Sequence, residues 1–250
     1  MRRIPFNTLQ FFLKNKYLIF LIITLILVIL FTYKDYGVAW DEKDNRIFGN
    51  QAFSYYSSLG IDRSYFFSWK KEFLLSRGPF IEALVQIPIN FSQNHSFEFY
   101  HLILALFSLI SFYFLYKTVI LLTKDKLISL SSIILLLIMP RFYGDIFNNS
   151  KDIPPVYFLL GIIYYSVKIL MGKSKLTDFF LLGIIGGIAS GQRAILIYSL
   201  VLFIIFYLIS NFINNRSTSK KIWKKTVLQM LFFFVSFLSF FYLFQPYLHI

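Results

Sequence analysis

Apolar residues fill most of this chain in long runs, which short polar segments separate. The first run, 17-YLIFLIITLILVILFTY-33, is typical of a membrane-spanning helix, because about 20 apolar residues cross a bilayer. The same pattern predicts an all-α polytopic membrane protein with about seven transmembrane helices. The predicted spans are 17–33, 99–116, 127–143, 153–172, 179–191, 194–213 and 226–245.

The fifth of these spans is short, and the charge of its neighbours predicts it. The loops around 173–178 and 215–225 are both basic, so the positive-inside rule places both in the cytoplasm. An even number of crossings must then lie between them. We therefore expect 183-GIIGGIASGQR-193 to turn back near the outer face as a tilted or broken helix. Its glycines at four-residue spacing indicate close helix packing.

The charge distribution predicts a cytoplasmic N-terminus. The net charge is +13, from 25 Lys and Arg against 12 Asp and Glu. With the N-terminus inside, the cytoplasmic segments carry the whole of this net charge. We interpret the charge as a topology signal and expect no nucleic-acid partner. The basic segment 1–16 lacks a small-residue cleavage pattern after its long apolar run, which predicts an uncleaved anchor.

The first outer loop, residues 34–98, is predicted to contain interfacial helices. In 44–59, four apolar residues recur at the spacing of one helix face, and we expect this aromatic face to lie on the membrane. These four residues are Phe48, Ala52, Tyr55 and Leu59. A second apolar piece, 78–91, is too short to span, and we expect Pro88 to break it.

Most carboxylates lie on the predicted outer side, eight in the first loop and two in the loop between spans three and four. A catalytic cavity that opens outward would use this bias. The ordinary alternatives are a helix cap and solvated charge for Asp41 and Glu42, and a helix start for Asp152 before Pro154. These alternatives stay open on sequence alone.

Two cationic side chains near this outer side are candidates for anion binding. Arg193 lies between two apolar spans, in a loop too short to leave the membrane region, where an ionisable residue is costly. We interpret it as functional, with a topology anchor as the alternative. Lys151 precedes Asp152, and its alternative is snorkelling to the interface.

Metal chemistry has limited support in the sequence. The chain has no cysteine, which excludes a thiolate metal site and a disulfide framework. Its histidines, His95, His101 and His249, do not fall at helical ligand spacing. Carboxylates suit Mg²⁺ or Mn²⁺, which leaves Asp152 as a candidate metal ligand.

Two stretches together resemble a known family. The pair Asp41–Glu42 opens a long outer loop after the first helix, and 140-PRFYGDIFNNSKDIPPVYF-158 is similar to a Pro-Arg-Phe … Asn-x-Lys-Asp-x-Pro pattern. The chain resembles the GT-C superfamily of membrane glycosyltransferases, near glycosyltransferase family 39. Relatives include protein O-mannosyltransferases and lipid A aminoarabinose transferases. The sequence departs from many relatives at Arg77-Gly78-Pro79, where they carry a His-Pro-Pro-like element.

The resemblance implies a hexosyl- or pentosyltransferase that uses a polyprenyl-phosphate sugar. The acceptor would be a protein, a lipid or a glycan on the outward face of a bacterial-type inner membrane. The resemblance also implies a role for six residues. The implied catalytic residues are Asp41, Glu42 and Asp152, and the implied donor-phosphate ligands are Lys151, Arg193 and Arg141.

Family members are longer than this chain. We therefore expect 1–250 to be a single integral membrane domain that is incomplete at its C-terminal end. Two other functions remain as alternatives. One is a transporter or flippase for a lipid or sugar, and the other is a non-catalytic membrane subunit or fragment.

Overall fold

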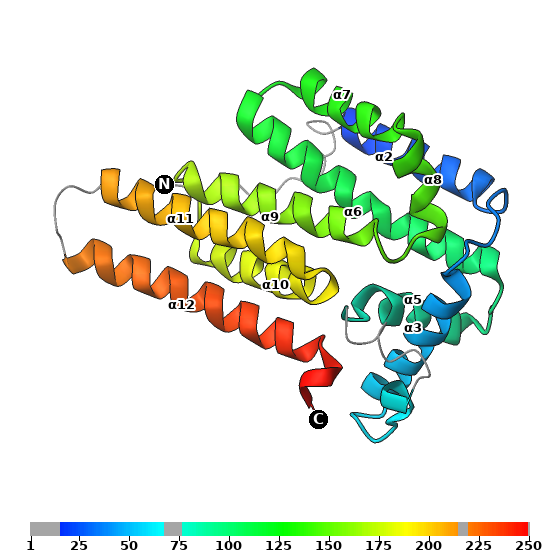
Figure 1. Ribbon diagram of the computed structural model, residues 1–250. Coiled ribbons are helices and arrows are strands. Elements are labelled where there is room, and N and C mark those ends of the chain that lie inside the picture. The colour runs from blue at the N-terminus through cyan, green and yellow to red at the C-terminus, as the bar shows by residue number, and fades with distance from the viewer. Residues whose placement is uncertain (1–15, 68–76, 215–219, 250) are drawn as a thin grey trace, which may run out of the picture.

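The structure is a computed structural model that describes residues 16–67, 77–214 and 220–249 (Figure 1). Regular structure in this part of the chain is helical, as the apolar runs predict. The longer helices are α2 (Lys16–Thr32), α3 (Glu42–Ser57), α5 (Phe80–Ser92), α6 (Phe97–Thr123), α7 (Lys126–Leu137), α8 (Pro140–Asn148), α9 (Pro154–Leu170), α10 (Leu176–Gln192), α11 (Ile197–Asn214) and α12 (Lys220–Leu243). Short 3-10 turns are η1 (Ser64–Phe67), η2 (Ala194–Leu196) and η3 (Pro246–His249). Most of the predicted N-terminal basic segment lies outside the described residues.

Three stretches of the described chain are long and apolar enough to cross a membrane, namely Phe97–Thr123, Ala194–Ile213 and Trp223–Leu243. The pair α7 and α8 adds a fourth if the two helices form one bent span. Three other predicted spans coincide with the shorter apolar helices α2, α9 and α10. The chain is therefore an α-helical membrane protein, whereas the seven crossings and their orientation stay predictions.

The third predicted span, 127–143, is not one straight helix. Helix α7 ends at Leu137, and α8 starts at Pro140 with its axis bent by 69°. The residue before the proline, Met139, is extended, with φ −72° and ψ 106°. A proline disfavours helical geometry in the residue before it and suits the first position of a new helix, which explains the bend.

Glycines bring α10 and α12 into close backbone contact, as their spacing predicts. A Cβ atom at Gly183 would meet the backbone oxygen of Phe233, and one at Gly187 would meet that of Phe237. Helix α10 runs unbroken through this glycine segment to Gln192, so the expected break falls after it, at Arg193. Helix α11 begins four residues later, after η2.

The aromatic face of α3 packs inside the protein, so the prediction that it lies on the membrane was wrong. Phe48 and Tyr55 are buried and share an apolar cluster with Tyr65 and Ala83. Tyr65, from the chain between α3 and α5, covers this face in place of lipid. Leu59 does not belong to the face, because α3 ends at Ser57 and Leu59 is 93% exposed.

Helix α5 continues through Pro88, contrary to the expected break. A proline inside a helix removes one backbone donor and strains the preceding turn. Its neighbours Val85 and Ile89 are fully buried, together with Tyr100 and Leu104 of α6. This packing holds the helix together across the proline.

The arrangement brings the segments with polar motifs to one end of the helix bundle. Helices α3 and α5 lie at that end, near the C-terminus (Figure 1). A hydrogen bond of 2.8 Å between the Tyr55 hydroxyl and His249 Nδ1 ties the two regions together. The predicted site residues all lie on this end or on the helix termini that reach it.

Candidate functional site

Asp41 is the residue that precedes α3, as the sequence predicts, but its side chain does not cap the helix. Its backbone oxygen accepts from Asn45 N at 3.0 Å, while the half-buried carboxylate makes no hydrogen bond within the described residues. A capping carboxylate would be occupied by backbone N–H groups. The Asp41 carboxylate is instead left unoccupied by the backbone donors of α3.

Glu42, the neighbour of Asp41, points the other way, into the protein. Its side chain is fully buried. One oxygen accepts from Ala39 N at 3.0 Å, and the other lies 2.8 Å from His101 Nε2 on α6. Through these contacts, Glu42 attaches the turn that carries Asp41 to the first part of α6.

The loop just before the Asp41–Glu42 pair lies against the second stretch that carries the family resemblance. The Tyr36 ring stacks on Phe147 with a centroid distance of 3.9 Å. One residue further along each segment, Asn148 Nδ2 donates to Gly37 O at 3.3 Å. The loop before Asp41 therefore lies against the end of α8, although 111 residues separate Gly37 from Asn148.

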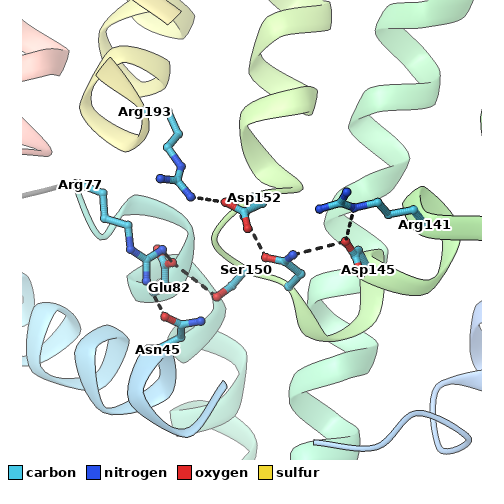
Figure 2. A network of polar contacts seen from close by, with 9 residues as sticks. Asn45, Arg77, Glu82, Arg141, Asp145, Ser150, Asp152 and Arg193 are labelled. Carbon is cyan, nitrogen blue, oxygen red and sulfur yellow. Dashed lines mark hydrogen bonds and ion pairs between the residues drawn. The ribbon is translucent and has the colours of Figure 1, made fainter. Parts of the chain in front are cut away.

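An open line of polar contacts runs from α8 to the end of α10 (Figure 2). Arg141 Nε lies 3.8 Å from the Asp145 carboxylate, which accepts from Asn149 Nδ2 at 3.4 Å. Asn149 Oδ1 in turn accepts from the backbone N of Asp152 at 2.9 Å. The line ends at the ion pair between Asp152 and Arg193. All its charged members are partly or largely exposed.

Arg193 holds its place through the geometry of the helix end. Its backbone is extended, with φ −146° and ψ 108°, so α10 stops there and the side chain leaves the helix direction. The guanidinium donates to Asp152 Oδ1, and the two side chains are 32% and 52% exposed. An ion pair this open leaves further guanidinium donors for an anionic ligand.

Beneath this line lies a buried polar network that the sequence did not reveal. Arg77 forms an ion pair with Glu82, and both side chains are fully inaccessible. Arg77 Nη2 also donates to Asn45 Oδ1 at 2.6 Å, and Ser150 Oγ donates to Glu82 Oε1 at 3.4 Å (Figure 2). Burial raises the pKa of the Glu82 carboxyl, and the adjacent Arg77 guanidinium opposes that rise. The network joins the first loop to the residue two before Asp152.

Hydrogen bonds to the Gly191 carbonyl connect this network with the open pair into what we call the polar ring. Its members are Asn45, Arg77, Gly78, Glu82, Ser150, Asp152, Gly191, Arg193 and Gln245. Gly78 N, directly after Arg77, donates to Gly191 O at 2.7 Å, two residues before Arg193. Gln245 Nε2 donates to the same oxygen at 2.5 Å. A Cβ atom at Gly78 would press on the backbone oxygen of Phe244, which explains the glycine there. The first loop, the second loop and the end of α10 thus hold one another in fixed positions.

Lys151 and Arg141, the other two predicted phosphate ligands, occupy different settings. Lys151 is half-buried between Ser150 of the buried network and Asp152 of the open pair. Arg141 is 91% exposed on α8 and reaches Arg193 only through the intervening line of polar contacts. Lys151 therefore adjoins both groups along the chain, whereas Arg141 lies at the far end of the open line of contacts.

A divalent metal at Asp152 has little support from the ligands nearby. The structure brings no three carboxylate or histidine side chains together anywhere in its described part. The Asp152 carboxylate faces the guanidinium of Arg193, and Asp145 faces Arg141. This set does not fit a metal ion, because each carboxylate already faces a cation.

Comparison with known proteins identifies one similarity. A family model described as dolichyl-phosphate-mannose-protein mannosyltransferase matches residues 76–240. No curated protein and no solved structure matches the chain. The family match confirms the resemblance to GT-C glycosyltransferases near family 39. It covers Arg77, Glu82 and Ser150 of the buried network, the open pair and helices α6 to α11, whereas Asp41, Glu42 and Asn45 precede the matched residues.

Proposed function

The chain belongs to the dolichyl-phosphate-mannose-protein mannosyltransferase family, and on that premise we propose that it transfers a sugar from a polyprenyl phosphate to an acceptor hydroxyl. The family makes it a membrane glycosyltransferase that uses a lipid-linked sugar. We further propose that the donor is a polyprenyl-phosphate sugar and that the transferred group is a hexose or pentose. The acceptor would be a protein, a lipid or a glycan on the outward face of a bacterial-type inner membrane.

Asp41 is the proposed general base. An acceptor hydroxyl is a weak nucleophile, and a positioned carboxylate takes its proton as the oxygen attacks the sugar carbon. The half-buried Asp41 carboxylate has no hydrogen-bond partner in the described chain that would compete for this role. The bond from the sugar carbon to the donor phosphate breaks as the new glycosidic bond forms. A single displacement of this kind inverts the configuration of the sugar carbon.

Glu42 positions Asp41 in this proposal. Its buried carboxylate holds Ala39 N and contacts His101, so it fixes the turn on which Asp41 stands. An acceptor cannot reach a fully buried group. We therefore assign Glu42, grouped with Asp41 as catalytic on sequence, a positioning role.

Arg193 and Lys151 are proposed to receive the donor phosphate. The leaving group is a lipid phosphate whose negative charge grows as the bond to the sugar breaks, and fixed cations stabilise that charge. Asp152 orients the Arg193 guanidinium, and Arg141 adds positive charge at the edge of the site. The half-open ion pair between Asp152 and Arg193 is the observation that carries this assignment.

Membranes that contain the full chain test the role of Asp41. The assay follows transfer of radiolabelled mannose from its undecaprenyl-phosphate or dolichyl-phosphate ester into membrane acceptors. Asp41→Asn is expected to lower transfer by about 10²–10⁴-fold, the usual contribution of a general base. Binding of polyprenyl phosphate should not change, because Arg193 and Lys151 remain. Asp35→Asn is the matched control, an exposed carboxylate in the same loop.

Two outcomes would count against the proposal. Full transfer by Asp41→Asn would remove Asp41 from catalysis. Equal loss in Asp41→Asn and Asp35→Asn would attribute the effect to the charge of the loop instead of a base. Expression level and thermal stability of each variant are measured beside activity, so that a misfolded protein is not taken for an inactive one.

A further inference from the structure

A polar groove outside the polar ring lies between α3, α5 and the start of α6, which sit together in Figure 1. Its volume is about 370 Å³. The residues that line it are Lys43, Arg46, Ile47, Asn50, Gln86, Asn90, His95 and Phe97. Two of these are cations and three are amides, and among these lining residues none is acidic. The groove therefore offers hydrogen-bond donors and positive charge to an anionic ligand.

Arg46 is held rigidly in this groove. Its Nη2 donates to His95 O at 2.7 Å, and its guanidinium lies 4.3 Å from the ring centroid of Phe97 and 5.5 Å from that of Tyr100. Stacking of this kind fixes the plane of the guanidinium. Donors that are already in place recognise a phosphate without the entropy cost of ordering a long side chain.

A buried donor in the groove has no partner in the protein. Gln86 is 4% exposed, and its Nε2 makes no hydrogen bond within the part of the chain that the structure describes. A buried amide without a partner costs free energy, which a ligand oxygen or an ordered water would recover. Gln86 lies on α5 one turn before Asn90, so both amides line the same side of the groove.

The surroundings of the groove favour a lipid over a soluble anion. Phe97 is the first residue of the long apolar helix α6, which places the groove at the end of a membrane span, the level of lipid headgroups. Ile47, which lines the groove, is 42% exposed. Ile87 and Phe91, which directly follow the lining residues Gln86 and Asn90 on α5, are 52% and 92% exposed. Headgroup and acyl chain would each meet a surface of matching polarity.

From these contacts we infer that the groove binds the headgroup of an anionic phospholipid. Arg46 and Lys43 bind the phosphate, Gln86 and Asn90 bind headgroup hydroxyls, and the acyl chains lie along Ile87 and Phe91. This site is separate from the proposed donor site, because it shares no residue with the polar ring. It does not depend on the proposed transferase activity.

Native mass spectrometry of the detergent-solubilised full chain, titrated with phosphatidylglycerol, tests the inference. The double variant Lys43→Gln/Arg46→Gln is expected to bind this lipid about tenfold more weakly or worse, since it loses two charge-assisted contacts. Lys34→Gln/Arg63→Gln is the matched control, which removes one exposed lysine and one exposed arginine elsewhere and should bind normally. Lys43→Gln alone changes only an exposed residue, so it cannot fail through misfolding, and it should show a smaller loss in the same direction.

Competition decides the chemical identity of the ligand. Phosphatidylcholine and inorganic phosphate should displace phosphatidylglycerol poorly. Equal losses in the groove variant and its control would overturn the inference, because they would indicate general attraction of anionic lipid to a basic protein. Displacement by inorganic phosphate at the concentration of the lipid would also overturn it in favour of a soluble anion. Displacement by polyprenyl phosphate at that concentration would assign the groove to the sugar donor instead.

Discussion

Two arginine–carboxylate pairs lie close together in this protein and differ mainly in their access to solvent. Arg77 and Glu82 are both fully buried, whereas Arg193 and Asp152 are 32% and 52% exposed. The buried pair has further hydrogen bonds from Asn45 and Ser150, and the open pair has its remaining donors towards solvent. The same chemical groups therefore hold the framework in one place and can meet a substrate in the other.

Solvent access explains this division of labour. Moving two charges out of water costs several kcal/mol each, and only close contacts with every partner return that energy. A buried pair of this kind cannot exchange partners without a large penalty. A partly exposed pair keeps its hydration, contributes little to stability and can accept an anionic ligand at low cost.

The largest effect is expected when the buried pair is broken. Arg77→Met leaves the Glu82 carboxylate in the interior without its cation, which should lower the free energy of unfolding by about 3–5 kcal/mol. Denaturant titration of the protein in detergent measures the change. Transfer activity should fall with the folded fraction.

The double variant Arg77→Met/Glu82→Leu separates a lost partner from lost packing. It removes both charges and should recover most of the stability, because no unpaired charge remains in the interior. A loss below about 1 kcal/mol in Arg77→Met alone would contradict a framework role for the buried pair.

The open pair should respond in the opposite manner. Arg193→Gln is expected to reduce sugar transfer by about 10²–10³-fold, the usual effect of removing one donor that stabilises developing charge. The free energy of unfolding should change by less than about 1 kcal/mol, as for other exposed ion pairs. Steady-state transfer and denaturant titration are measured on the same preparation, and Arg193→Lys should restore part of the activity. A large loss of stability with normal activity per folded molecule would reverse the assignment.

The smallest effect is expected at Arg141, which extends the comparison to a third exposure. This side chain is 91% exposed and lies 3.8 Å from its partner Asp145. Arg141→Gln should raise the KM for the donor by about fivefold at most, because an ion pair in water contributes about 1 kcal/mol. Stability should not change measurably. The control is Lys124→Gln, which changes an exposed lysine at the far end of α6. If Arg141→Gln reduced transfer as much as Arg193→Gln, Arg141 would belong to the centre of the site.

The sequence singled out both members of the open pair as site residues, although not their contact, and it did not predict the buried pair. Arg193 attracted attention because a charge between two apolar spans is costly, and Asp152 because of its motif. Glu82 lies inside the apolar run 80-FIEALVQIPINF-91, where a lone carboxylate carries the same cost and could have been noticed. Its partner Arg77 precedes it by five residues, a spacing that helix geometry does not pair, so only the fold reveals the contact.

Sequence patterns within each segment predicted the helices, but not where each helix ends or which side chains pack against it. Gly183 and Gly187 predicted close packing because the reason, absence of a side chain, is local. Pro140 ended a predicted span through its effect on the residue before it, a local signal that hydropathy alone does not weigh. The buried face of α3 was predicted to meet lipid. This prediction failed because the aromatic residues that cover the face come from the segment after α3, where helical periodicity gives no signal.

The Gly191 carbonyl has a consequence for biogenesis. This one oxygen accepts from Gly78 and from Gln245, which lie far apart along the chain, so Gln245 leaves the ribosome long after Gly78. At about 5–20 residues per second, the first loop waits about 10–30 s for its last partner. The contact from Gln245 to this part of the proposed site therefore forms only after α12 has been synthesised.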